Sequence, residues 1–234
     1  MNPLLSLIDD VLADADAGAN PFFKALADGS FTREDFLETQ YQFHHAVTFF
    51  SRPMAALAAK IPDAWMRVEI VRNVWEEHGE GDKSRMHGAT FVTFLSRLAG
   101  VDEDDVRREL ASRPLWPEVR AFNTLLIGAC ALEDHLVGAA TLGIVERMFV
   151  EISSVIGRTV VARGFVPLEK MAHYNVHEKL DVRHAADFFG VLAPAWSEGP
   201  RERYLIEQGL RMGAMAFDQL YARLYRCRER RWLR

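Results

Sequence analysis

The 234-residue sequence has few cysteines, no long apolar run and little net charge. Its two cysteines, Cys130 and Cys227, are too few for a disulfide-stabilised scaffold. It has no stretch of about 18 apolar residues that would span a membrane, and its N-terminus reaches acidic residues before a signal-peptide core forms. A formal net charge of −5 points to neither a nucleic-acid nor an anionic-membrane partner. With 49% hydrophobic residues the chain is too apolar to be disordered, so we expect a folded, cytoplasmic protein.

Linkers, repeats and low-complexity stretches are also missing, and apolar residues recur at intervals of three and four. This pattern predicts a single all-α domain over residues 1–234, a bundle of about seven main helices. The expected helical stretches are residues 3–15, 33–60 with a kink at Pro53, 62–79, 83–98, 102–112, 117–129, 132–156, 175–192 and 197 to the tail. We expect the arginine-rich end, residues 221–234, to be a solvated basic cluster.

Three polar side chains in the segment 173–192 fall on a face that should be buried. His177, Asp181 and His184 have the spacing H-x3-D-x2-H, and at about 100° per residue they lie within about 60° of one another on a helix. Phe188 continues the same stripe into apolar residues. Burying two imidazoles and a carboxylate is unfavourable unless they are paired or bind a metal. Taken alone, the segment fits a buried polar network as well as a metal site.

Glu146 and His87 repeat this pattern on two other predicted helices. Glu146 shares its helical face with Leu142 and Phe149, and His87 shares its face with Phe91. A carboxylate in an apolar stripe is seldom without a partner. Each residue alone has an ordinary explanation, because a buried glutamate usually meets an arginine and a buried histidine is usually a hydrogen-bonded core residue.

The acidic cluster before His87 offers two carboxylates for one site. Glu77 is ten residues from His87, about 15 Å along an unbroken helix, which is too far for a shared ion. Gly79 and Gly81 favour a break that would let the two side chains converge. Glu80, seven residues before His87, is the simpler geometric choice. The spacing does not decide between Glu77 and Glu80.

Inward-facing polar residues on three separate helices together favour a metal centre. Helix bundles that collect carboxylates and imidazoles in their core hold di-iron or di-manganese pairs, and oxygen-rich ligand sets with imidazole suit Fe or Mn. The lack of paired cysteines argues against structural zinc. The paired E-x-x-H motifs of ferritin-like proteins are missing, because here three candidate ligands share one helix.

The candidate ligands also carry a resemblance to a known family. The residues are Glu77, His87, Glu146, His177, Asp181 and His184. Together they resemble the ligand pattern of the haem-oxygenase-like di-metal oxidases, which are relatives of TenA thiaminase and PqqC. The stretches NPFFKALADGSFTREDFLETQYQFHHAVTFF (20–50) and NVWEEHGEGDKSRMH (73–87) are similar to family segments. The resemblance covers residues 20–195, and it implies Glu77 as the ligand with Glu80 as the alternate.

The resemblance implies a seven-helix haem-oxygenase-like domain that holds two iron ions without haem, with manganese as the alternative metal. All six residues would be metal ligands, and the carboxylates Glu77, Glu146 and Asp181 would serve catalysis, at least one of them as a bridge. Such an O2-dependent diiron oxidoreductase would oxidise a small carboxylic acid, amino acid or amine by desaturation, C–C cleavage, decarboxylation or N-oxygenation. The resemblance further implies a homodimer.

The substrate pocket is expected around residues 43–50, Trp75, Phe91 and Phe149, which favours a partly apolar substrate. One family branch is thought to make p-aminobenzoate from its own tyrosine, and the matching position here is Phe23, which argues against that chemistry. Tyr41 and Tyr174 lie in segments similar to that branch, and we expect them to be core residues, with a redox role as the alternative.

Two other functions compete with the oxidase. The first is a metal-free enzyme of the TenA or PqqC kind, for which Cys130 is the available nucleophile. The second is a helical binding protein without catalytic activity, in which the polar core would serve specificity.

Overall fold

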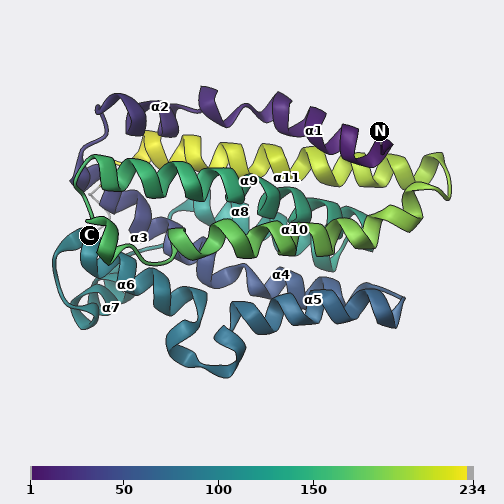
Figure 1. Cartoon of the computed structure of the whole chain (residues 1–234), viewed down its shortest axis with the longest axis horizontal. Coiled ribbons are helices and arrows are strands. Elements are labelled where there is room, and N and C mark those ends of the chain that lie inside the picture. The colour runs from purple at the N-terminus through teal and green to yellow at the C-terminus, as the bar shows by residue number, and fades with distance from the viewer. Residues whose placement is uncertain (1, 231–234) are drawn as a thin grey trace.

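A computed structural model describes residues 2–230, without the side chains of residues 175–180. Most of the long helices lie roughly alongside one another (Figure 1). In chain order the α-helices are α1 (Pro3–Ala15), α2 (Pro21–Asp28), α3 (Arg33–Phe49), α4 (Ser51–Lys60), α5 (Ala64–Glu77), α6 (His87–Ala99), α7 (Glu103–Ser112), α8 (Pro117–Ala131), α9 (His135–Ala162), α10 (Tyr174–Trp196) and α11 (Pro200–Cys227). The short 3-10 turns are η1 (Ala17–Ala19), η2 (Gly79–Gly81), η3 (Lys83–Arg85) and η4 (Leu168–Lys170). The predicted all-α class is confirmed, although residues 2–230 contain eleven α-helices instead of about seven.

Side-chain caps start several of these helices where the sequence predicts them. The Asn2 side chain accepts a hydrogen bond from the backbone of the first turn of α1, and Thr32 does the same for α3. The expected helices do not include α2, although Asn20 and Pro21 repeat the cap-and-proline start of α1. The same local signal therefore begins both N-terminal helices.

The helix expected over residues 33–60 is two helices, not one kinked helix. Helix α3 ends at Phe49, α4 begins at Ser51, and Pro53 lies in the first turn of α4. Proline has no backbone N–H and its ring clashes with the carbonyl four residues earlier, here that of Phe49. The helix therefore ends before Pro53 instead of bending at it.

Helix α9 runs through the core and packs against both α10 and α11. Two glycines of α11 allow this approach, because a Cβ at Gly209 would lie 2.5 Å from the Val137 carbonyl oxygen and one at Gly213 would lie 2.6 Å from that of Thr141. Most of the first five turns of α9 are buried. Any polar side chain on its inner face, Glu146 included, is therefore held inside the bundle.

The described part of the basic C-terminal end is solvated only in part: Arg223 and Arg226 are exposed, as expected, whereas Arg228 and Arg230 pair with the protein surface. Arg230 pairs with Glu118 at 3.0 Å, and Arg228 lies 3.7 Å from Asp35 with its guanidinium over the ring of Tyr225. Residues 231–234 lie outside the described residues. Within the described chain, none of the helices has the length and apolar character needed to cross a membrane.

The close contact between α9 and α11 predicts a clear cost for one added methyl group. Gly209→Ala should lower the free energy of unfolding by about 1–3 kcal/mol, because the Cβ would push α11 away from α9. Gly190→Ala in α10 is the matched control: its Cβ meets no atom within 4 Å, so higher helix propensity should raise stability by up to ~1 kcal/mol. Urea denaturation of both variants measures the difference, and equal stabilities would contradict the tight α9–α11 packing.

Candidate metal centre

A break between α5 and α6 brings Glu77 and His87 together. Helix α5 ends at Glu77, α6 begins at His87, and the two short turns η2 and η3 lie between them. Gly79 has φ +67°, and a Cβ there would lie 2.7 Å from the backbone of Arg85, so the turn needs glycine at this position. As a result, Glu77 Oε2 lies 2.8 Å from His87 Nδ1, which is the convergence expected from a break at the glycines.

The alternate carboxylate, Glu80, lies at the surface. Its backbone has φ +56° and its side chain pairs with exposed Arg85 at 3.1 Å. Of the two carboxylates that the spacing left open, the structure turns Glu77 inward and Glu80 toward solvent.

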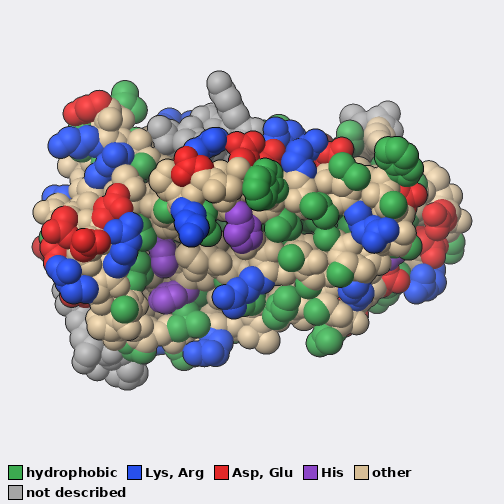
Figure 2. Space-filling model, turned by 90° about the horizontal axis from the view of Figure 1, so that it is seen from below, with side chains coloured by type: hydrophobic (Ala, Val, Ile, Leu, Met, Phe, Trp, Pro, Cys, Tyr) green, Lys and Arg blue, Asp and Glu red, His purple; other side chains and the backbone are tan. Residues whose placement is uncertain are grey.

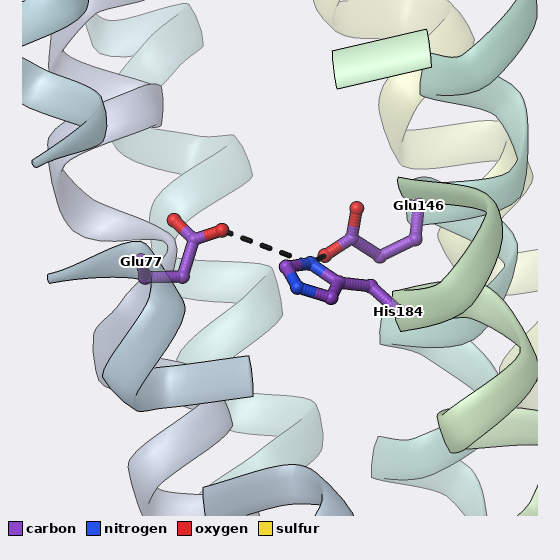
Figure 3. Close-up of side chains that lie close together, drawn as sticks. All are labelled: Glu77, Glu146 and His184. Carbon is purple, nitrogen blue, oxygen red and sulfur yellow. Dashed lines mark ion pairs between the residues drawn. The ribbon is translucent and has the colours of Figure 1, made fainter. Parts of the chain in front are cut away.

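Glu77, Glu146 and His184 converge from α5, α9 and α10 (Figure 3). His184 Nδ1 lies 3.4 Å from Glu146 Oε1 and 3.9 Å from Glu77 Oε1, and all three side chains are buried. Asp181, one turn before His184, is also buried and lines the same cavity as Glu77 and Glu146. The side chain of the sixth expected ligand, His177, lies outside the described residues.

A small cavity of about 50 Å³, partly open to solvent, lies against this cluster. One side is polar and includes Glu77, His87, Glu146 and Asp181. The other side is apolar and consists of Phe43, Ala46, Val47, Phe50, Phe122, Val145, Phe149 and Phe217. The expected lining by residues 43–50 and Phe149 is correct, whereas Trp75 is 55% exposed on the outside of α5 and Phe91 is buried behind the lining.

Burial and the charges of neighbouring side chains shift the pKa values of Glu146, His184 and His87. Burial raises the pKa of Glu146 to about 7. Burial alone would lower the pKa of His184, but its interactions with Glu146, Glu77 and Glu76 outweigh this and raise it to about 10. The pKa of His87 is raised in the same way, against the effect of burial, chiefly by the charge of Glu77. The metal-free cluster therefore holds a proton on His184 at neutral pH.

The arrangement of these atoms fits a bound metal ion. Glu146 Oε1 and His184 Nδ1 are buried and have no hydrogen-bond partner within the described part of the chain, although each can bind a cation. Ligand atoms about 2.1 Å from one ion lie about 3–4 Å apart, and the 3.4 and 3.9 Å separations around His184 Nδ1 match this. Carboxylate and imidazole donors suit iron or manganese.

Glu76 holds His184 in the orientation that the cluster requires. His184 Nε2 donates to Glu76 Oε2 at 2.8 Å, which leaves Nδ1 facing Glu77 and Glu146. Arg183 also donates to Glu76. Burial would raise the pKa of Glu76, but these hydrogen bonds outweigh it and lower that pKa. Metal-binding histidines commonly donate their second ring N–H to a carboxylate in this way.

His173 is a cavity residue that the sequence reasoning missed. Its φ of 66° and ψ of −74°, with the Tyr174 N–H donating to the Ala172 carbonyl at 2.9 Å, form a strained γ-turn. The buried ring lines the cavity, with Nδ1 3.1 Å from Thr90 Oγ1 and its edge against Phe91. Backbone strain of about 1–3 kcal/mol is typical of functional sites. The only sequence signal was its place in the polar segment 173–192.

The two tyrosines singled out from sequence have core environments. The Tyr174 hydroxyl donates to Gln40 Oε1 at 2.6 Å, and burial raises its pKa well above the ordinary value. The Tyr41 ring lies 4.1 Å from the Arg113 guanidinium. Phe23 is buried against Tyr221, with ring centroids 4.9 Å apart.

Solved structures place this architecture in a known class. A haem-oxygenase-like domain of unknown function from Shewanella denitrificans is 15% identical, with a TM-score of 0.72 over 98% of this chain and 90% of the other. A CADD-like protein of unknown function from Nostoc punctiforme is 15% identical, with a TM-score of 0.73 over 96% of both chains. A TenA homologue from Pseudomonas syringae is 16% identical, with a TM-score of 0.73 over 96% of this chain and 92% of the other. The protein therefore has the haem-oxygenase-like fold.

The family follows from the sequence match. Residues 37–218 match the family described as iron-containing redox enzymes, and the chain belongs to that family. A search of the curated proteins found no significant match. The predicted resemblance to the haem-oxygenase-like metal enzymes is thus confirmed at the level of fold and family.

The raised pKa of His184 predicts that metal binding strengthens with pH. A histidine must lose its proton to bind a metal, and with a pKa of about 10 His184 is protonated at neutral pH. Affinity for Mn(II) should therefore rise about tenfold per pH unit for each proton released, between about pH 6 and 8. Calorimetric titration in buffers of different ionisation enthalpy measures the proton release, and pH-independent affinity would contradict it.

The contact between Glu76 and His184 predicts a role in metal binding without direct coordination. Glu76→Gln should weaken Mn(II) binding about 10- to 100-fold, because a neutral amide holds the His184 ring less firmly. Glu69→Gln is the control on the same helix, since Glu69 pairs with Arg72. Equal Mn(II) affinities of the two variants would show that Glu76 does not position His184.

Proposed function

We propose that this protein is a non-haem diiron oxidase or oxygenase that uses O2 to oxidise a small carboxylic acid, amino acid or amine. One observation carries the proposal: Glu77, Glu146 and His184 converge from three helices beside a largely apolar cavity. Membership in a family of iron-containing redox enzymes supports iron as the metal.

The proposed ligands divide between two ions. Glu77, Glu146 and His184 would hold one ion, and the second would use His87, Asp181 and His177, with a carboxylate shared between the ions. Bound iron would supply the redox chemistry with O2. The protein's own contribution is to hold these side chains in place, through Glu76 for His184 and through the α5–α6 turn for Glu77 and His87.

The cavity lining indicates which part of a substrate it accepts. Its apolar side includes Phe50, Phe122, Phe149 and Phe217, and the described lining residues contain no lysine or arginine. An amine of the substrate would therefore lie at the polar end, beside Glu146. A substrate carboxylate would bind there through the iron, and an aliphatic or aromatic portion would contact the phenylalanines. This complementarity supports a partly apolar acid or amine.

The metal-free alternative requires a reactive cysteine, and Cys130 is poorly suited to that role. It is fully buried on α8, and burial raises its pKa to about 12. A nucleophilic cysteine needs access to substrate and a thiolate at neutral pH. The environment of Cys130 thus favours the metal enzyme over a TenA- or PqqC-like reaction at this residue.

The ligand assignment predicts different effects for two nearby glutamates. After anaerobic loading with Fe(II), the wild-type chain should hold about two iron ions and consume O2. Glu77→Gln should weaken iron binding at least about tenfold, because it removes a charged donor from the buried cluster, whereas exposed Glu80→Gln should behave as wild type. Metal analysis and O2 uptake with a panel of fatty acids, amino acids and amines measure both effects. Loss of iron from Glu80→Gln but not Glu77→Gln would reverse the assignment, and a folded wild-type chain without iron would refute the function.

A further inference from the structure

Helix α5 presents an apolar stripe to solvent, flanked by the partly exposed side chains of Glu69 and Arg72. Its exposed residues are all apolar, namely Ala64, Trp65, Val68, Val71 and Trp75. Trp65 is 85% exposed, Trp75 is 55% exposed, and each valine is 54% exposed. Figure 2 views the molecule from below, and its right half, where α5 lies, shows many hydrophobic side chains. Exposed helices of soluble proteins usually turn charged residues outward, so this stripe marks an interaction surface.

Two charged residues of α5, Arg72 and Glu76, pair with residues of α10. Arg72 pairs with Asp187 at 2.9 Å and also with Glu69, and Glu76 pairs with His184 and Arg183. These contacts tie the polar flank of the helix to its neighbour. A helix that lies on a membrane instead keeps its charged flank in water. The arrangement therefore favours a protein partner over a lipid surface.

The apolar residues are spaced almost symmetrically along the helix. Trp65 and Trp75 are centred on residue 70, and Val68 and Val71 are centred between residues 69 and 70. A two-fold axis close to residue 70 would set Trp65 near Trp75 of a second copy and Val68 near Val71 of that copy. Such reciprocal contacts define an isologous dimer interface.

The exposed area of the stripe approaches what a dimer needs. A tryptophan buries up to about 250 Å², so with these exposures the two tryptophans and two valines offer roughly 500 Å² per chain. Exposed Val182 and Ala186 on α10 extend the apolar surface beyond the ion pairs. A standard interface takes about 800 Å² from each partner, so the stripe alone offers more than half of that area.

We propose that α5 pairs antiparallel with α5 of a second copy of this chain, through Trp65, Val68, Val71 and Trp75. This contact would cover the outside of the helix whose inner side carries Glu76 and Glu77. Trp75 also packs on the turn that follows α5, since a Cβ at Gly81 would lie 2.9 Å from its ring. The interface would thus brace the α5–α6 turn from outside. The proposal rests on this surface and does not depend on the proposed diiron function.

The mass of the protein in solution tests the pairing. The wild-type chain should sediment as a dimer, and Val68→Glu should halve its mass, because two-fold symmetry would bury two unpaired carboxylates. Met215→Glu is the matched control, since Met215 is 51% exposed on α11. It should leave the dimer intact, and circular dichroism confirms that each variant is folded. A monomeric wild type, including one that binds lipid vesicles, or a Val68→Glu dimer would overturn the proposal.

Cysteine cross-linking tests the antiparallel register independently of stability. The two native cysteines are buried. A mixture of Trp65→Cys and Trp75→Cys chains should form a disulfide-linked dimer under mild oxidation, because the interface places these positions opposite each other. Either variant alone should not, because equivalent positions lie about 15 Å apart along the pair, too far for a disulfide. Equal cross-linking in all three samples, or none in the mixture, would overturn the register.

Discussion

The structure depends on ionisable side chains that pair inside a helix bundle. Glu77, Glu146 and His184 are buried where three helices meet, and a lone charge at that depth would be strongly destabilising. They are tolerated because each faces an opposite charge, and because Glu76 satisfies the second nitrogen of His184. This electrostatic requirement fixes α5, α9 and α10 relative to one another. It also leaves donor atoms directed at a common point, which is the condition for binding a metal ion.

The connection between α5 and α6 is as important as the ligands that flank it. An unbroken helix would hold Glu77 and His87 about 15 Å apart, whereas the turn at Gly79 places their side chains 2.8 Å apart. Close packing of α11 against α9 holds the part of the cavity lining that α9 contributes. Gly209 and Gly213 allow α11 to lie directly against α9, and α9 carries both Glu146 and the apolar residues Val145 and Phe149 that line the cavity.

Helical periodicity alone identified the inward positions of His87, Glu146, Asp181 and His184, because each shares a face with apolar neighbours within one helix. Features set by the turns or by tertiary contacts escaped the sequence. The spacing alone left Glu77 and Glu80 open, because the choice depends on the backbone angles of η2, and only the family resemblance favoured Glu77. The role of Glu76 depends on where α10 packs. His173 has its orientation from a strained turn outside any helix, so no periodic pattern predicts it.

The inner and outer sides of α5 differ because several of its charged residues are used in contacts with neighbouring helices. A helix at the surface of a soluble protein normally places its charges in water, but here Arg72 and Glu76 are used to hold α10 and orient His184. Glu77 faces the buried cluster. What remains for the outer side is the series Trp65, Val68, Val71 and Trp75, an apolar stripe that is favourable only when something covers it. The contacts that Glu76 and Glu77 make with His184 turn these two charges away from the apolar stripe, so one helix carries the candidate site on its inner side and the stripe on its outer side.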